Sequence, residues 1–358
     1  MTVLIDKSGP YAHAATSVQR TMTLVLAALA PATLFNVWLF GWPALNLFLV
    51  TLAAALATEA LCLRLANRPL NPTLWDGSAV LTGWLLAMSL PPWAPWWIGA
   101  VGGFVAIALG KHVFGGIGQN LFNPAMVARV ALLISFPVPM TAFTAPAPIG
   151  SADAIGFAQG LAITFGGTPI PDAVSAASAL GLVKTELSRG VPVSESMAHA
   201  PQMIDLALGM VPGSFGETSA LLILLGGLFL IAKRIITWHI PVAMMATVFG
   251  LGWLFHAIDP ARYADGIFHL LSGATLLGAF FIATDYVTSP VSKQGQLVFG
   301  IGIGLLTWVI RTYAGYPEGV AFAVLLMNSL SPLIDRGFRP RVFGRTRKGE
   351  PLPAKGGK

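Results

Sequence analysis

The chain has 358 residues, of which 55% are hydrophobic and only 10% charged, and its formal net charge at pH 7 is +6. A soluble domain carries about 25% charged residues, so this composition, with a mean hydropathy of +0.73, excludes a soluble protein and indicates a polytopic protein in a lipid bilayer. The single cysteine, Cys62, excludes an internal disulfide, a structural zinc site and an iron–sulfur cluster held by this chain alone, because such a cluster needs about four ligands.

The hydropathy pattern predicts an all-α fold with ten membrane-spanning helices, since each span needs about 20 mostly apolar residues. In chain order the predicted spans are 21–40, 44–63, 77–91, 94–110, 124–137, 220–233, 237–256, 267–284, 296–311 and 318–334. The third, fifth and sixth are short. Short spans often mark helices that are broken around a site near the membrane midplane.

The distribution of Lys and Arg predicts the orientation. With the N-terminus in the cytoplasm, the inner loops and the C-terminal tail hold most of the basic residues, and the outer segments hold only Lys184, Arg189, Arg262 and Arg311. The basic residues therefore lie at helix ends and in a tail, as membrane orientation requires, and not on a patch for nucleic acid. An even number of spans places both termini on the cytoplasmic side of a bacterial inner membrane.

An internal repeat divides the predicted spans into two sets of five. Gly77 in the stretch 76–92 aligns with Gly273 in 272–290 at an offset of 196, and 118–127 aligns with 315–324 at nearly the same offset. An odd number of crossings per repeat inverts the second copy, and inverted repeats are typical of transporters. The alternative is that any two apolar helices look alike. The predicted parts are a cytoplasmic segment 1–20, a first repeat 21–137, an extracytoplasmic cap 138–219 with one or two short helices, a second repeat 220–334 and a basic cytoplasmic tail 335–358.

Ionisable residues at membrane depth are costly and are candidates for function. By position these are Glu59, Asp76, Arg129 and Asp285. We expect Asp285 and Glu59 to lie on an ion path, against the alternative that each is a carboxylate at a helix end. Arg129 is as well suited to satisfying carbonyl groups or a carboxylate as to meeting a ligand.

The stretch 111–130 is the densest polar cluster between spans. Asn120 and Asn123 offer amides that could bind a planar heterocycle through donors and acceptors. The alternative for Asn123 is that it caps the helix that begins at Pro124. A haem site is not favoured, because His239 and His256 lie at opposite ends of one span.

The motifs of the chain resemble the NqrB/RnfD family of membrane subunits, and most closely the RnfD type found in Rnf electron-transport complexes. The resembling stretches are 8–10 with Arg20, DGSAVLTG at 76–83, GKHVFGGIGQNLFNPAMVARV at 110–130, GETS at 216–219, SGATLLGAFFIATD at 272–285 and GYPEGVAFAVLLMN at 315–328. The resemblance implies a redox subunit, not catalytic alone, of an ion-translocating complex. Such a complex moves electrons between reduced ferredoxin and NAD with coupled Na⁺ or H⁺ transport, and its partner subunits hold the iron–sulfur clusters. The rival function is a small-solute channel or transporter without a redox role.

The resemblance also implies an FMN whose phosphate a flavin transferase esterifies to a hydroxyl in a motif similar to D-x-x-[S/T]-[G/A]-A-T. Asp172 and Ser175 match this motif, and Ser178 stands at the acceptor position, where the family usually has threonine. The alternative interpretation of 171–184 is a polar loop helix without a ligand.

Thr275 ends a similar stretch, but His269 stands six residues before it where the motif has aspartate. We therefore prefer Ser178. The resemblance further implies a second, non-covalent flavin, riboflavin, near Asn120 and Asn123.

Overall fold

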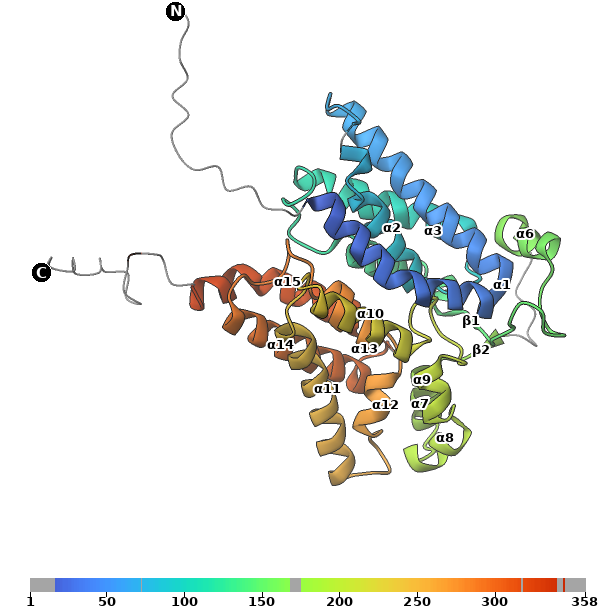
Figure 1. Cartoon of the computed structure of the whole chain (residues 1–358). Coiled ribbons are helices and arrows are strands. Elements are labelled where there is room, and N and C mark those ends of the chain that lie inside the picture. The colour runs from blue at the N-terminus through green and yellow to red at the C-terminus, as the bar shows by residue number, and fades with distance from the viewer. Residues whose placement is uncertain (1–16, 72, 168–174, 317, 340–343, 345–358) are drawn as a thin grey trace, which may run out of the picture.

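The computed structural model of the chain describes residues 17–71, 73–167, 175–316, 318–339 and 344 (Figure 1). Nearly all of its regular structure is helical, as the composition predicts. The elements are α1 (Val18–Leu65), η1 (Thr73–Trp75), α2 (Ser78–Ser89), α3 (Trp96–Phe104), η2 (Val105–Leu109), η3 (His112–Phe114), α4 (Pro124–Ser135), α5 (Pro137–Thr141), β1 (Phe143–Thr144), α6 (Phe157–Gly166), β2 (Ser175–Ala176), α7 (Ala179–Ser188), α8 (Val193–His199), α9 (Met203–Leu208), α10 (Ala220–Ala232), α11 (His239–Ile258), α12 (Gly266–Leu271), α13 (Thr275–Leu277), η5 (Gly278–Ile282), α14 (Lys293–Tyr313) and α15 (Val320–Gly337).

Helix α1 is a hairpin of two helical arms and contains the first two predicted spans. A straight helix of its 48 residues would be about 72 Å long, more than twice the ~30 Å of a bilayer core. The helical geometry breaks at Gly41, with φ 73° and ψ −156°, and the second arm runs back beside the first (Figure 1). Carbonyl groups at the break find other donors: Phe40 O accepts from Trp93 Nε1 at 2.9 Å, and Leu39 O from Ala147 N at 3.0 Å.

Each of the other predicted spans coincides with helical structure, but their lengths differ. Four segments are long and apolar enough to cross a membrane by length and composition, namely Val18–Leu65, Trp96–Phe114, His239–Ile258 and Lys293–Tyr313. The predicted span 267–284 is not one continuous helix: it is divided into α12, α13 and η5, with the chain non-helical around the left-handed Gly273. The fold is thus an all-α fold with several apolar helices, as expected of a polytopic membrane protein. The number of crossings stays a prediction.

The positions of helix starts follow the spacing of the internal repeat. Helices α2, α3 and α4 begin at residues 78, 96 and 124, and α13, α14 and α15 begin at 275, 293 and 320. The second set therefore begins 197, 197 and 196 residues after the first. Gly77 and Gly273, which the repeat aligns, both have positive φ, at 83° and 64°. Helix order thus repeats along the chain, and the inverted arrangement stays a prediction.

The two halves of the chain share one apolar core. Helix α1 packs against α2 and α3 of its own half and against α10 of the other, and α4 packs against α15. The buried side chains of this core come from both halves, from Leu29 of α1 to Met327 of α15. A ligand that binds at this junction would therefore contact both halves.

The segment between the halves is more structured than the one or two short helices that we expected. It contains α6, α7, α8 and α9, and an antiparallel pair of two-residue strands, in which Phe143 pairs with Ala176 and Thr144 with Ser175. Helices α7 to α9 form a small core of their own that also includes Phe268 of α12. Figure 1 shows these helices together at one end of the second half. We call residues 138–219 the cap, and its core explains why so polar a segment folds.

Candidate functional site

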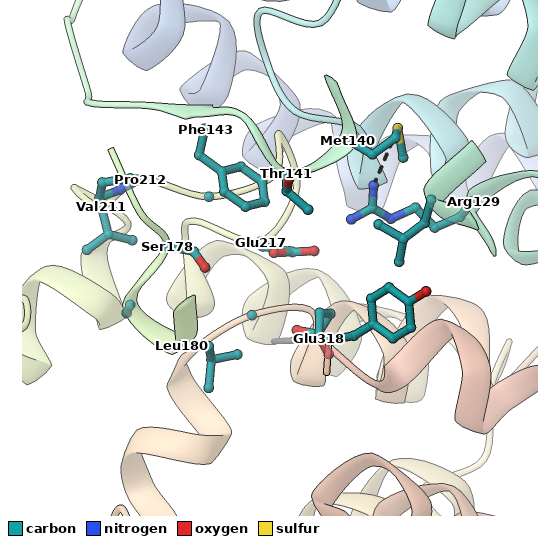
Figure 2. A pocket seen from close by; sticks show the side chains of 15 residues that line it. Arg129, Met140, Thr141, Phe143, Ser178, Leu180, Val211, Pro212, Glu217 and Glu318 are labelled. Atoms are coloured by element: carbon teal, nitrogen blue, oxygen red, sulfur yellow. Dashed lines mark hydrogen bonds between the residues drawn. The ribbon is translucent and has the colours of Figure 1, made fainter. Parts of the chain in front are cut away.

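An opening beside the start of α7 contains the predicted attachment residue, and we call it the Ser178 hollow. Its volume is about 580 Å³, including space open to the surroundings. Its walls come from α4, α5, β1, the start of α7, and the loops that precede α10, α13 and α15. Its charged side chains are Arg129, Glu217 and Glu318, and in Figure 2 Glu217 lies between Ser178 and Arg129. The walls of the hollow therefore come from the cap and from both halves of the chain.

Ser178 is the N-cap of α7. Its backbone is extended, with φ −62° and ψ 157°, and its Oγ accepts a hydrogen bond from Gly181 N at 3.2 Å. Serine is a preferred N-cap because its short side chain satisfies an N–H group that has no partner within the helix. The pairing of β1 with β2 fixes the chain just before this residue. Ser178 is partly exposed at the edge of the hollow, so its hydroxyl can be reached.

The other predicted residues of the motif are placed differently. Asp172 lies outside the described residues, and of Ser175 the structure describes only the backbone, which is paired in β2. Thr275, the alternative acceptor, is fully buried at the start of α13, and its hydroxyl donates to His269 O at 2.8 Å. Of the two candidate acceptors, Ser178 is thus partly exposed and Thr275 is fully buried.

A lysine holds α7 against the second half. The ammonium of Lys184 donates to the carbonyl oxygens of Arg311 at 3.0 Å and Tyr316 at 2.9 Å, and also to that of Ala314. Two of these carbonyls, those of Arg311 and Ala314, lie at the C-terminal end of α14, where helical partners are missing and a cation is favoured. The contact fixes the start of α7, and with it Ser178, relative to the hollow.

Glu318 lies on the floor of the hollow and pairs with Arg311 behind it. The Arg311 Nη2 atom lies 2.9 Å from Glu318 Oε2, and the same carboxylate accepts from the backbone N–H groups of Ala274, Gly319 and Val320. A carboxylate with this many donors is satisfied without a ligand. We therefore assign this pair a structural role.

Glu217 lacks such a set of donors, and its charge is poorly supported. Burial, followed by the nearby negative charge of Glu318, raises the pKa of the Glu217 carboxyl to about 7, against the opposing effects of Arg129, the side chain of Ser214 and the charge of Arg311. The carboxyl therefore exchanges a proton near neutral pH.

This pKa predicts how stability changes with pH. The folded state holds the Glu217 proton up to about pH 7, whereas the unfolded state loses it near 4.5. In this window the folded Glu217 binds more protons than the unfolded one, so its contribution to the free energy of unfolding should fall by up to about 2–3 kcal/mol as the pH rises from 4.5 to 7. Denaturant unfolding of the purified chain and of Glu217→Gln in detergent at pH 5 and pH 8 measures this, because the difference in stability between the two proteins isolates this carboxyl. The difference should change by that amount between the two pH values, whereas the difference between the wild type and the exposed cap variant Glu195→Gln should stay constant. A difference between the wild type and Glu217→Gln that is the same at both pH values would contradict the prediction.

A second opening lies at the junction of the two halves, and we call it the Asn123 cavity. Its volume is about 1150 Å³, including space open to the surroundings. Its walls are mostly apolar and come from α1, α2 and α4 on one side and from α10, η5 and the following loop on the other. Asn120, Asn123 and Asp285, which the sequence analysis selected separately, all line it, together with Lys111. A large apolar cavity with a few convergent polar groups is the usual form of a small-molecule site.

Asn123 caps α4, which is the alternative given for it from the sequence, and it also contacts Asp285. Its Oδ1 caps α4 by accepting from Ala125 N at 3.1 Å and Met126 N at 3.3 Å, and its Nδ2 lies 3.5 Å from Asp285 Oδ2. Asn120 Nδ2 donates to Phe122 O at 3.0 Å. These amides are therefore held in place by the protein and still border the cavity.

Glu59 lies beside this cavity in a buried ion pair. Lys111 Nζ is 2.9 Å from both carboxylate oxygens of Glu59 and 2.8 Å from Ser78 Oγ, and His112 Nε2 is 3.1 Å from Glu59 Oε2. Neither Glu59 nor Lys111 is more than 3% exposed. The ammonium occupies the place where a passing cation would meet the carboxylate. Of the two ion-path candidates, only Asp285 borders the cavity directly.

Sequence reasoning gave no role to Lys111, Glu217 or Glu318. Each stands alone in a short polar stretch close to an apolar helix, within GKHVF at 110–114, GETS at 216–219 and GYPEG at 315–319. The signal in the sequence that could have identified these residues is a single charge at the boundary of an apolar helix. The Glu59 partner of Lys111 lies 52 residues away and could not be read from it.

Comparison with known proteins gives one consistent result. The model of the NQR2, RnfD, RnfE family matches residues 5–344. The chain is 56% identical over 345 residues to a protein of Halorhodospira halophila described as the D subunit of an ion-translocating oxidoreductase complex, with 96% of this chain and 97% of the relative covered. Proteins of the same description are 54% identical in Stutzerimonas stutzeri, over 94% of this chain and 95% of the relative, and 52% identical in Rhodobacter capsulatus, over 95% and 94%.

Proposed function

Because the chain belongs to the NQR2, RnfD, RnfE family, we propose that it is the D-type membrane subunit of an ion-translocating oxidoreductase complex and carries a flavin on Ser178. The observation that carries this proposal is the position of Ser178 on an open hollow at the start of α7. The electrons would pass between reduced ferredoxin and NAD, as in Rnf-type complexes, and the transport of Na⁺ or H⁺ would be coupled to them.

The residues at the hollow fit the phosphate of an FMN. Ser178 has the hydroxyl oxygen that a phosphoester needs, and it stands at the N-terminus of a ten-residue helix, where free N–H groups and the helix dipole favour an anion. A flavin transferase would make the ester, and it would reach Ser178 from solvent. Bound there, the flavin supplies reversible uptake of one or two electrons.

The protein's own part in this function is to place the attachment point. The β1–β2 pair fixes the chain that enters α7, and Lys184 holds α7 against the end of α14. The single cysteine means that iron–sulfur clusters would be held by partner subunits. These partners would assemble with the chain in the bacterial inner membrane, with both termini in the cytoplasm.

The Asn123 cavity supports a second, non-covalent flavin in the same proposal. A riboflavin ring has donors and acceptors on its edge and a large apolar face. The fixed amides of Asn120 and Asn123 and the apolar walls offer both kinds of partner. Asp285 borders the same cavity between the halves and remains the first candidate for the ion path. Glu59, which is paired with the cavity residue Lys111, is the second candidate.

Replacing Ser178 tests the covalent site. The chain produced with a flavin transferase should give a fluorescent band after denaturation, and Ser178→Asp should give none. Aspartate keeps the N-cap of α7, whose loss would cost about 1 kcal/mol, but cannot form the ester. Ser178→Thr should keep the fluorescence. Flavin released on denaturation should be equal in all three proteins, since it would come from the Asn123 cavity.

Other outcomes would change the assignment. Fluorescence that persists in Ser178→Asp and disappears in Thr275→Ala would move the attachment to Thr275. Wild-type protein without flavin in either fraction would contradict the redox role and favour a small-solute transporter.

A further inference from the structure

Arg129 is a buried cation that has no acidic partner among the residues that the structure describes. Its side chain comes from α4 and the residue is 6% exposed, yet its guanidinium makes no ion pair with any described residue. The hydrogen bond that it does make is from Nη1 to the thioether sulfur of Met140, at 3.9 Å. A guanidinium has five N–H donors, and a buried charge is normally paired because removing it from water is costly. Arg129 therefore has unused capacity to bind an anion.

This capacity is directed into the Ser178 hollow. Arg129 and Ser178 line the same opening, and Figure 2 shows the guanidinium of Arg129 directed into it, across from Ser178. The two residues come from different parts of the fold, α4 of the first half and the start of α7 in the cap. A group attached to Ser178 thus has a helix N-terminus at its base and a buried cation on the facing wall.

The carboxyl groups in the hollow do not neutralise Arg129 permanently. Glu318 is occupied by Arg311 and by three backbone N–H groups. Glu217 forms no ion pair with a described residue. Glu318, Arg129 and Arg311 are the charged groups that act on it, and their combined effect with burial leaves its pKa near 7. Glu217 can therefore become neutral at modest cost, which leaves Arg129 as an uncompensated positive charge beside the neutral pair of Arg311 and Glu318.

We propose that Arg129 binds the anionic phosphate of the group carried on Ser178, and that Glu217 takes up one proton from solvent when this phosphate is present. The inference rests on the proposed covalent flavin and assigns it a binding residue. Arginine suits this ligand because its planar fork matches two phosphate oxygens at once. Protonation changes Glu217 from a competing anion into a neutral neighbour that can donate a hydrogen bond.

The test compares covalent flavin per chain in a small set of variants made together with the flavin transferase. Arg129→Gln should lower the flavin content about ten-fold, as expected for the loss of a charge-assisted contact in a buried site. Glu217→Gln imitates the protonated carboxyl and should not lower the content. The control that should leave it unchanged is Arg189→Gln, which removes an exposed cap arginine. Thermal unfolding of each variant in detergent confirms that the chain is folded.

The double variant Arg129→Gln/Glu217→Gln separates anion binding from simple pairing of the two side chains. If Arg129 only compensates Glu217, then removing both charges restores the flavin content, and the proposal is overturned. If Arg129 binds the phosphate, the double variant stays as low as Arg129→Gln. Full flavin content in Arg129→Gln itself would also overturn the proposal while leaving the attachment to Ser178 intact. Wild-type chain without covalent flavin would overturn both.

A spectroscopic measurement addresses the proton. In the wild-type chain the phosphorus NMR resonance of the attached group should shift with pH around a midpoint above 7, because the charge of the phosphate raises the pKa of the Glu217 carboxyl beyond the value of about 7 that it has without a ligand. A phosphodiester does not itself titrate there, so the shift would report Glu217. The resonance should be independent of pH in Glu217→Gln. An unchanging resonance in the wild type would refute the role of Glu217.

Discussion

Replacing Glu59 by alanine is expected to lower the free energy of unfolding by about 3–5 kcal/mol, the usual cost of breaking a buried ion pair from one side. Glu59 is fully buried, and Lys111 is 3% exposed with its Nζ 2.9 Å from both carboxylate oxygens. Without the carboxylate, the ammonium keeps only Ser78 Oγ, at 2.8 Å, as a hydrogen-bond acceptor among the described residues. At 3% exposure the ammonium has little contact with water, so much of its desolvation cost is left uncompensated.

The matched variant is Glu59→Met/Lys111→Met, which removes both charges and keeps the volume apolar. It should recover most of the loss, because replacing a whole buried pair by apolar residues is often neutral or stabilising. An exposed pair gives the second control: Glu186→Ala, which removes the partner of Arg189, should cost less than about 1 kcal/mol. Denaturant unfolding in detergent measures all three. A double variant as unstable as Glu59→Ala would show that packing, and not charge, explains the loss.

Replacing Gly273 by alanine should destabilise the chain by about 2–5 kcal/mol, from left-handed strain together with overpacking. Gly273 has φ +64°, and an added Cβ would collide with Glu318 Oε2 and lie 2.8 Å from both Arg311 Nη2 and Leu180 Cδ1. The two charged groups cannot move freely, because the carboxylate and guanidinium are held by each other and by backbone groups. The substitution therefore acts on the floor of the Ser178 hollow as well as on stability.

Gly190→Ala separates the two causes. Gly190 also has a positive φ, at +84°, but an added Cβ there meets nothing within 4 Å. It should cost about 1–2 kcal/mol for the backbone alone. Thermal unfolding of both variants measures the difference, and covalent flavin content should fall only in Gly273→Ala. Equal losses of stability would mean that the collision of the added Cβ with the pair of Arg311 and Glu318 contributes nothing to the destabilisation.

Hydropathy predicted where the helices lie because apolar length is a local property of the chain. The ten expected ranges all fall on helical segments, and the repeat offset of 196 recurs in the helix starts. The break in 267–284 was missed because its residues, apart from His269, are apolar or small. There the backbone turns at Gly273, whose conformation depends on Glu318, 45 residues further along the chain.

The sites were predictable only in part. Short motifs selected Ser178, Asn123 and Asp285 one at a time, since each stands out against an apolar background. That Asn123 and Asp285 line one cavity depends on packing between residues 162 positions apart. That Arg129 has no ion-pair partner among the described residues could not be predicted either, because pairing between distant side chains is a property of the fold and not of the sequence.

The hairpin in α1 constrains how the chain is made. Its arms meet at a single non-helical residue, Gly41, so no polar loop separates the first two apolar segments. When the two arms insert together, only a tight turn has to cross to the far side of the bilayer. We therefore expect the biosynthetic machinery to release the two arms into the bilayer as one preformed pair, and a long polar insertion after Gly41 to uncouple their integration.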